Sequence, residues 1–249
     1  MADLIATLAE GRVEDLAVGQ HWTGVVVQTE RGCRCGLAST LRGDRDRPSL
    51  AAAEEAGRWI GRSGRELARL ALRGREHLLE RAIGMAAINA LLPQDPATWT
   101  NDNAAAVIAR HGASRRVALV GHFPFVDALR REVGTLWVLE LEPRPGDLPA
   151  EAAAEVVPQA DVLAMTGTTL INDTFDALMA LRRPDALVVV LGPSTPLSPV
   201  LFDYGVDVVG GSVVEDVDAV LRALREGGGF RHLHRAGVRL VTMVRPGLT

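Results

Sequence analysis

The second half of the chain alternates short apolar segments with segments of helical pattern. Continuous apolar segments that alternate with helices are typical of a mostly parallel sheet whose strands are buried on both faces. We therefore expect a Rossmann-like α/β unit from about Arg115 onward. The apolar segments are VALVG from Val117, TLWVLEL from Thr135, DVLAMTG from Asp161, ALVVVLG from Ala186, VDVVGG from Val206 and VRLVTMV from Val238.

The first hundred residues follow a different pattern, which predicts a small α+β unit. Trp22 to Thr29 and Cys33 to Thr40 alternate in polarity around a turn that contains Gly, and this arrangement predicts a β-hairpin. The polar segment from Leu41 to Pro48 predicts a loop, and helical segments are expected to begin near Ser49.

Helix signals follow in the chain. Ser63, with Glu66 three residues later, predicts a capping box for a helix through Leu72. The segment from Arg75 to Leu91 has apolar residues at helical spacing, which predicts a second helix. A third helix is expected after Asn101 as its N-cap.

The periodicity breaks between Pro93 and Asn101, and we place the domain joint there. The predicted α+β domain spans residues 1–100, and the predicted Rossmann-like domain spans residues 101–249. At 249 residues the chain is long enough for two domains of ordinary size.

Composition excludes several classes of protein. The chain is 47% hydrophobic and 23% charged, with a formal net charge of −4, and no basic patch suggests nucleic-acid binding. All 27 basic residues are Arg, which excludes a Schiff-base or P-loop lysine. No apolar run is long enough for a membrane span, so we expect a cytoplasmic protein without a membrane partner. A homodimer is one expectation, since symmetric dimers are the commonest oligomers.

Three loops are expected to form the rim of a small-ligand site. In an open parallel sheet, ligands bind outside the carboxyl ends of the strands. The loops that follow the first, third and fourth predicted strands contribute Gly121, His122 and Phe123; Thr166, Gly167, Thr168, Thr169 and Asn172; and Gly192, Pro193, Ser194, Thr195 and Pro196.

The Thr pair invites two interpretations. Thr168 and Thr169 stand at the start of a predicted helix that runs to about Leu181, where free amides and hydroxyls would receive a phosphate or carboxylate. The alternative is that they merely cap the helix. Asn172 favours a site, because it lies one helical turn further on.

Glu140 and His122 are the candidate charged groups of the rim. Glu140 follows Gly121 by about the separation at which dinucleotide-binding folds place an acidic residue on a ribose. The GxGxxG fingerprint is absent, which argues against classical NAD binding. His122 is a candidate acid, base or metal ligand; the alternative is a structural histidine.

Other polar residues carry weaker signals. Asn89 either faces an interdomain cleft or is satisfied by local backbone. Cys33 and Cys35 share one face of a strand, but two thiols are too few for a structural zinc site. His232 and His234 are more readily explained as part of a solvated loop than as a metal pair.

The chain resembles a bacterial and archaeal family whose suggested role is heavy-metal chelation and whose domains were first catalogued without a function. Members combine a domain similar to the enolase N-terminal fold with a Rossmann-like domain, and the resemblance places a site in the cleft between them. It implies that Asn89 faces the rim residues. The matching segments are GLAST from Gly36, IGMAAINAL from Ile83, GHFPF from Gly121, VLELEP from Val138, TGTTLIND from Thr166 and GPSTPLSPVLFDYGV from Gly192.

Three functional hypotheses remain. The first is a protein that binds a small anionic or metal-chelating ligand between its domains, with a heavy or transition metal ion as the candidate cofactor and His122 and Glu140 as candidate metal ligands. The second is an enzyme that uses a nucleotide or adenosyl cofactor, with Glu140 on the ribose and His122 as acid or base. The third is an accessory protein without catalysis. No residue is assigned a catalytic role.

Overall fold

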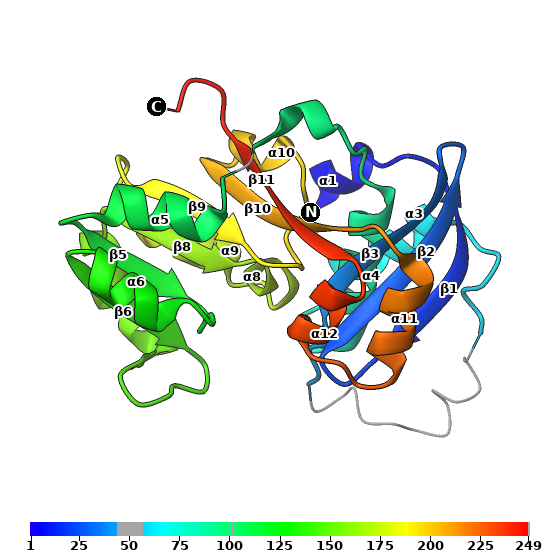
Figure 1. Ribbon diagram of the computed structural model, residues 1–249, viewed down its shortest axis with the longest axis horizontal. Coiled ribbons are helices and arrows are strands. Elements are labelled where there is room, and N and C mark those ends of the chain that lie inside the picture. Colours follow the sequence, from blue (N-terminus) through cyan, green and yellow to red (C-terminus); the bar gives the residue numbers. More distant parts are fainter. Residues whose placement is uncertain (44–56, 101, 249) are drawn as a thin grey trace.

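A computed structural model describes residues 1–43, 57–100 and 102–248. Two sheets organise the chain (Figure 1). The small sheet contains three antiparallel strands in the order β1-β2-β3, and the large sheet contains eight strands in the order β4-β11-β10-β9-β8-β5-β6-β7. The structure thus confirms the predicted fold class, a small α+β part followed by a Rossmann-like part with a mostly parallel sheet.

The small sheet contains the predicted hairpin. Strands β2 (Trp22–Thr29) and β3 (Gly32–Ser39) pair in antiparallel register from Trp22 opposite Ser39 to Thr29 opposite Gly32. Gly32 has a φ of 106°, a value that favours glycine at this tight turn. The alternation upstream of the hairpin forms a third strand, β1 (Arg12–Val18).

Helices cover both faces of the small sheet. Helix α4 (Leu78–Leu91) packs against β2 and β3 on one face. Helices α11 (Val217–Arg225) and α12 (Phe230–Arg235) come from the far end of the chain and lie over the other face (Figure 1). The predicted division into residues 1–100 and 101–249 stays a prediction, and contacts between the two parts are extensive.

The remaining N-terminal elements are short. Ser63 caps α3 as predicted, because its side chain accepts a hydrogen bond from the backbone N–H of Glu66. The helix predicted from Arg75 begins three residues later, at Leu78. The helical segments predicted near Ser49 lie outside the described residues. The short elements are α1 (Ala2–Ala6), α3 (Gly64–Ala68), and the 3₁₀ turns η2 (Arg69–Leu72) and η3 (Pro96–Thr98).

All six predicted apolar segments are strands of the large sheet. Five of them pair in parallel, and β11 runs antiparallel to β10. Two-residue strands lie at the edges. The strands are β4 (Trp99–Thr100), β5 (Arg116–Val120), β6 (Thr135–Glu140), β7 (Leu148–Pro149), β8 (Val162–Thr166), β9 (Leu187–Leu191), β10 (Val208–Val214) and β11 (Val238–Val244).

Two helix predictions need correction. The N-cap of α5 is Asn103, whose side chain accepts from the N–H of Ala105, whereas the predicted cap, Asn101, lies outside the described residues. The helix predicted from Thr168 to Leu181 is broken into α8 and α9. The helices and 3₁₀ turns of this part are α5 (Ala104–Gly112), α6 (Val126–Glu132), η4 (Ala150–Ala152), α7 (Ala153–Val156), η5 (Val157–Gln159), α8 (Thr168–Ile171), α9 (Phe175–Leu181) and α10 (Val200–Asp203).

One hydrophobic core runs through both sheets. It joins α4 and the inner face of β2 and β3 to one face of the large sheet, so that Ile88 and Met165 belong to the same buried cluster. The opposite face of the large sheet packs against α5 and α6. Because the core is continuous, the two sheets are held at a fixed distance, and the loops between them can form a defined site.

Gly36 tests the packing of α4 on the small sheet. A Cβ at Gly36 would overlap the backbone of Ala86 and Ala90 in α4, so Gly36→Ala should destabilise the protein by at least the 1–3 kcal/mol that is typical of overpacking. Gly229→Ala is the matched control, since a Cβ there meets nothing within 4 Å. Urea unfolding of both variants would show the difference, and equal midpoints would contradict the close approach.

Candidate functional site

The strand order of the large sheet reverses between β5 and β8. The chain passes from β5 to β6 on one side, and it returns to β8 and β9 on the other (Figure 1). Ligands of open α/β proteins bind at the carboxyl ends of strands at such a reversal. The loops that leave these two strands begin at Gly121 and Gly167, which are the loops that sequence analysis selected.

A cavity of about 420 Å³, here called the switch-point cavity, lies at this reversal. The ends of β5, β6 and β8 line it, together with α9. It contains eight of the predicted site residues, namely Gly121, His122, Phe123, Glu140, Thr166, Thr168, Thr169 and Asn172.

A second cavity of about 730 Å³, here called the joint cavity, lies where the two sheets meet. Trp22 and Ser39 of the small sheet line it, and so does Phe230 of α12. Both volumes are within the range of small-molecule sites, about 300–1,000 Å³. The predicted residues in its lining are His122, Phe123, Thr166, Gly192, Pro193 and Ser194.

His122 lines both cavities, and two hydrogen bonds hold it in place. Its backbone N–H donates to Oε1 of Glu140 at 2.6 Å. Its ring Nδ1 lies 2.8 Å from Oδ2 of Asp147, whose side chain is only 1% exposed. With a carboxylate as acceptor, Nδ1 carries the proton, and Nε2 of the neutral ring presents a lone pair.

Asp147 is ionised in this arrangement. Burial raises the pKa of Asp147, but the hydrogen bonds from His122 and from the backbone N–H of Arg144 outweigh that effect and hold the pKa below its usual value. Its second oxygen, Oδ1, is buried and has no hydrogen-bond partner among the described residues.

Glu140 organises the rim backbone. Besides the N–H of His122, its carboxylate accepts the N–H of Leu141 at 3.1 Å. The structure therefore joins Glu140 to His122 through a backbone amide, and the assignment of both side chains as metal ligands stays a prediction.

The hydrogen bonds of the Thr-rich segment contradict the interpretation of Thr168 and Thr169 as caps of a long helix, whereas their role in a ligand site stays a prediction. The hydroxyl of Thr169 donates to the carbonyl of Thr166, and the hydroxyl and N–H of Thr168 both bond to Oγ1 of Thr166, so neither side chain caps a long helix. Helix α8 ends at Ile171, because Asn172 accepts from Thr174 and the next residue, Asp173, adopts a φ of 63°.

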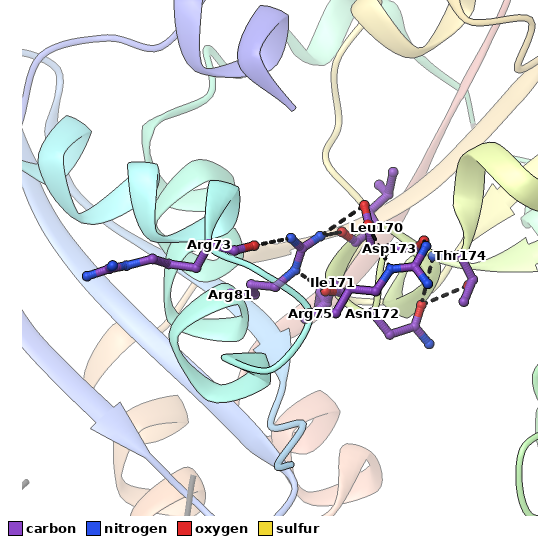
Figure 2. Close-up of polar contacts among 8 residues, drawn as sticks. All are labelled: Arg73, Arg75, Arg81, Leu170, Ile171, Asn172, Asp173 and Thr174. Carbon is purple, nitrogen blue, oxygen red and sulfur yellow. Dashed lines mark hydrogen bonds and ion pairs between the residues drawn. The ribbon is translucent and has the colours of Figure 1, made fainter. Parts of the chain in front are cut away.

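A buried arginine of α4 holds this break in place. Arg81 donates through Nε to the carbonyl of Ile171 and through a terminal nitrogen to the carbonyl of Leu170 at 3.1 Å (Figure 2). Its other terminal nitrogen donates to the carbonyl of Arg73 at 2.5 Å. Burial lowers the pKa of Arg81, and Asp173 partly offsets this effect. The loop that lines the switch-point cavity is thus anchored to the N-terminal part.

Asn89 and Ser194 form a second anchor between the two parts. The amide of Asn89 donates to the carbonyls of Leu37 at 2.8 Å and Ser194 at 3.2 Å. The hydroxyl of Ser194 accepts from the N–H of Ser39 at 2.8 Å. Asn89 therefore bonds to backbone on both sides of the joint, and it is not among the residues that line the two cavities.

Three further predicted residues lie behind the rim. A Cβ at Gly167 would lie 2.5 Å from Oγ1 of Thr195, which shows that the two loops are in close contact. Thr195 is 1% exposed. Gly167, Thr195 and Pro196 line neither cavity and instead support the residues that do.

The described ranges contain no group of three or more His, Cys, Asp or Glu side chains placed to hold a metal ion. Cys33 is exposed and Cys35 is buried beneath α11, and neither lines a cavity. His232 and His234 lie exposed on the helix α12 and not in the predicted loop.

Sequence reasoning missed several residues of the site. Asp147 follows an irregular polar segment, and nothing in its spacing relates it to His122. Arg81 lies on α4, and the helical periodicity of this segment does not reveal that its side chain is buried against the end of α8. Trp22 and Phe230 are 208 positions apart, and only the packing of α12 on β2 brings them together.

Comparison with known proteins places this architecture in a family. A family model described as "Putative heavy-metal chelation" matches residues 103–243, which is more than half of the chain, and a second model with the same description matches residues 1–92. The chain belongs to this family. An uncharacterized protein of Methanocaldococcus jannaschii is 29% identical over 155 residues, which cover 59% of this chain. The match spans 60% of the length of that relative.

Two solved structures share the fold. A protein of unknown function from Desulfitobacterium hafniense has a TM-score of 0.82 and 24% identity over 98% of this chain and 97% of its own. A protein of unknown function from Pyrococcus horikoshii has a TM-score of 0.78 and 21% identity over 98% of this chain and 96% of its own. At these identities the likeness concerns the fold. In this chain, no helix within the described ranges has the length and apolar character needed to cross a membrane.

The two arginines that contact Asp173 provide a test of the joint. Arg81→Met leaves buried carbonyls without donors and should lower the free energy of unfolding by about 2–4 kcal/mol. Arg75→Met removes an ion pair whose arginine side chain is 66% exposed, and it should cost less than about 1 kcal/mol. Urea unfolding measures both, and equal losses would show that Arg81 does not anchor the loop.

The two thiols should react differently. Burial, followed by the charges of Cys33 and Asp15, raises the pKa of Cys35 to about 12, so its thiol stays protonated and covered. We expect Ellman's reagent to titrate only Cys33 in the native protein and both thiols in urea. Rapid reaction of native Cys33→Ser protein would contradict this assignment.

Proposed function

We propose that this protein binds a small organic ligand across the joint cavity and the switch-point cavity. The observation that carries the proposal is that His122, Phe123 and Thr166 line both cavities. A ligand that extends from these three residues into the joint cavity would also contact Trp22 and Ser39 of the small sheet. The ligand has a flat, largely apolar body and a polar edge able to chelate a metal.

The walls of the joint cavity favour an apolar body. Phe123 and Phe125 stack with ring centroids 5.1 Å apart, and Trp22 and Phe230 lie 5.8 Å apart as a tilted pair. All four aromatic residues belong to the lining. Aromatic walls of this kind recognise flat ligands by stacking and burial of apolar surface.

The switch-point cavity supplies polar groups for the edge of the ligand. Thr166, Thr168 and Asn172 line it beside the imidazole of His122. The oxygen of the Asn172 side chain is engaged by Thr174, so its NH₂ group is the part that is available to a ligand. Few convergent polar groups beside an apolar wall are typical of a small-molecule site.

The charges favour a chelating ligand over an anionic one. Within the described lining of the joint cavity, Arg239 is the one arginine, and it donates to Glu215 at 2.7 Å. The lining of the switch-point cavity contains Glu140 and no arginine. An anion would therefore meet little positive charge.

The family description supports a role with metals, and the residues limit its form. Because no cluster of three side-chain ligands exists in the described part of the chain, a bare heavy-metal ion lacks a cage here. A ligand that brings its own donor atoms avoids this requirement. Its binding would depend on the cavities and not on a protein metal centre.

An enzyme with an adenosyl or nucleotide cofactor is the weaker alternative. Its main support was Glu140 on a ribose, and both oxygens of Glu140 accept backbone N–H groups. Phe123 and Pro124 fill the turn after β5, where a pyrophosphate would need bare backbone.

Calorimetric titration with metal-free 1,10-phenanthroline tests the proposal, because this probe is a flat aromatic chelator. We expect saturable binding at one site with a negative heat-capacity change. Leu240→Trp should weaken binding at least tenfold, since the 46%-exposed Leu240 lines the joint cavity and a larger ring would narrow it.

Leu72→Trp is the matched control, because Leu72 is 51% exposed and lines neither cavity. Adenosine and NAD⁺ serve as rival probes. Absence of phenanthroline binding, together with saturable binding of adenosine that Leu240→Trp leaves unchanged, would overturn the proposal in favour of the enzyme.

A further inference from the structure

The imidazole of His122 has the geometry of a metal ligand with a built-in orienting group. Nδ1 donates to the buried carboxylate of Asp147, and Nε2 has no protein partner among the described residues. Histidines that bind metals almost always donate their other ring N–H to a carboxylate, carbonyl or water. The ring lines both cavities and is 19% exposed, so a ligand can reach it.

The carboxylate of Asp147, which is bonded to Nδ1 of His122, favours a cation at Nε2 of the same ring. Oδ1 of Asp147 is buried without a partner among the described residues, so the negative charge of Asp147 is only partly compensated. A buried charge of this kind gains when positive charge is added to its partner. Coordination of a metal ion at Nε2 adds that charge through the imidazole.

The geometry points to Nε2 of His122 as a single protein ligand for a metal ion that enters already chelated by a small molecule. The inference rests on the proposed function, and it defines the substrate class as metal chelates with one exchangeable coordination position. A lone imidazole cannot hold a bare ion tightly, whereas it can complete a chelate.

The coordination step is a simple exchange. The bond between the metal and a coordinated water breaks, and a bond from the Nε2 lone pair to the metal forms. The proton of the ring stays on Nδ1, where Asp147 holds it. No oxidation or proton release is required.

Asp147 acts as a positioning residue in this scheme. Its hydrogen bond fixes the tautomer and the direction of the ring. Loss of such an outer partner typically weakens metal affinity by about 10- to 100-fold. Asp147→Asn should have an effect of this size on metal chelates and little effect on the metal-free chelator.

The copper(II) complex of 2,2′:6′,2″-terpyridine is a suitable probe, because its three nitrogens leave one strongly bound position for exchange. In the wild-type protein, electron paramagnetic resonance should show a fourth nitrogen in place of the water oxygen. Pulsed measurements should detect the remote ring nitrogen of a coordinated imidazole. Asp147→Asn should change the coupling of that remote nitrogen, which a purely structural role of Asp147 would not do.

Variants of His122 test whether the imidazole signal comes from this residue. His122→Ala and His122→Gln should both abolish the imidazole signal, and they should weaken binding of the copper complex at least tenfold more than they weaken binding of metal-free terpyridine. His234→Ala is the matched control, since His234 is exposed on α12. Because the spectrum of the wild-type protein is itself decisive, misfolding of a variant leaves the test intact.

The outcomes separate this inference from the proposed function. If the complex binds in a Leu240→Trp-sensitive manner but keeps its water ligand, His122 is not a metal ligand and the inference fails, while the proposed function stands. If neither metal-free terpyridine nor its copper complex binds, both fail. An imidazole signal that persists in His122→Gln would also overturn the inference.

Discussion

The buried guanidinium group of Arg81 holds the two parts of this protein together. Arg81 on α4 is 5% exposed, and it satisfies carbonyls from its own side of the joint and from the end of α8. A buried charge is costly unless hydrogen bonds compensate it, so these bonds form only when α8 stops where it does and α4 lies beside it. The break at Asn172 and the position of the switch-point cavity both follow from this requirement.

The contacts of Asn89 and Ser194 form a second anchor, which is uncharged but also holds the two parts together. Asn89 and Ser194 are neutral, and each bonds to backbone across the joint. Together with Arg81 they hold the loops after β8 and β9 against the N-terminal part. Other residues of the same loops line the two cavities. A rim held in this way is preorganised, and a ligand loses less free energy on binding because little has to be ordered.

Local pattern predicted more of the fold than of the site. The six apolar segments and the hairpin depend on neighbours in sequence, and all became strands. The break between α8 and α9 is held by Arg81, which is about 90 positions away in the sequence, so the local sequence does not reveal this contact. Likewise, Thr168 and Thr169 line the switch-point cavity, but their hydroxyls bond to Thr166, because a short turn offers nearer acceptors than a helix cap. The pairing of His122 with Asp147 requires the loop after β6 to fold back, and no periodic pattern encodes that.

Sequence patterns alone do not reveal a site for a metal chelate. A search for metal ligands looks for His, Cys, Asp and Glu at fixed spacings, and a protein that binds a preformed chelate needs no such set. It needs a cavity of suitable volume, apolar walls for the organic body, and one oriented donor atom at the point where the metal would lie. These features arise from β5, β8, α12 and the loop after β6, which are separated in sequence and meet only in the folded chain.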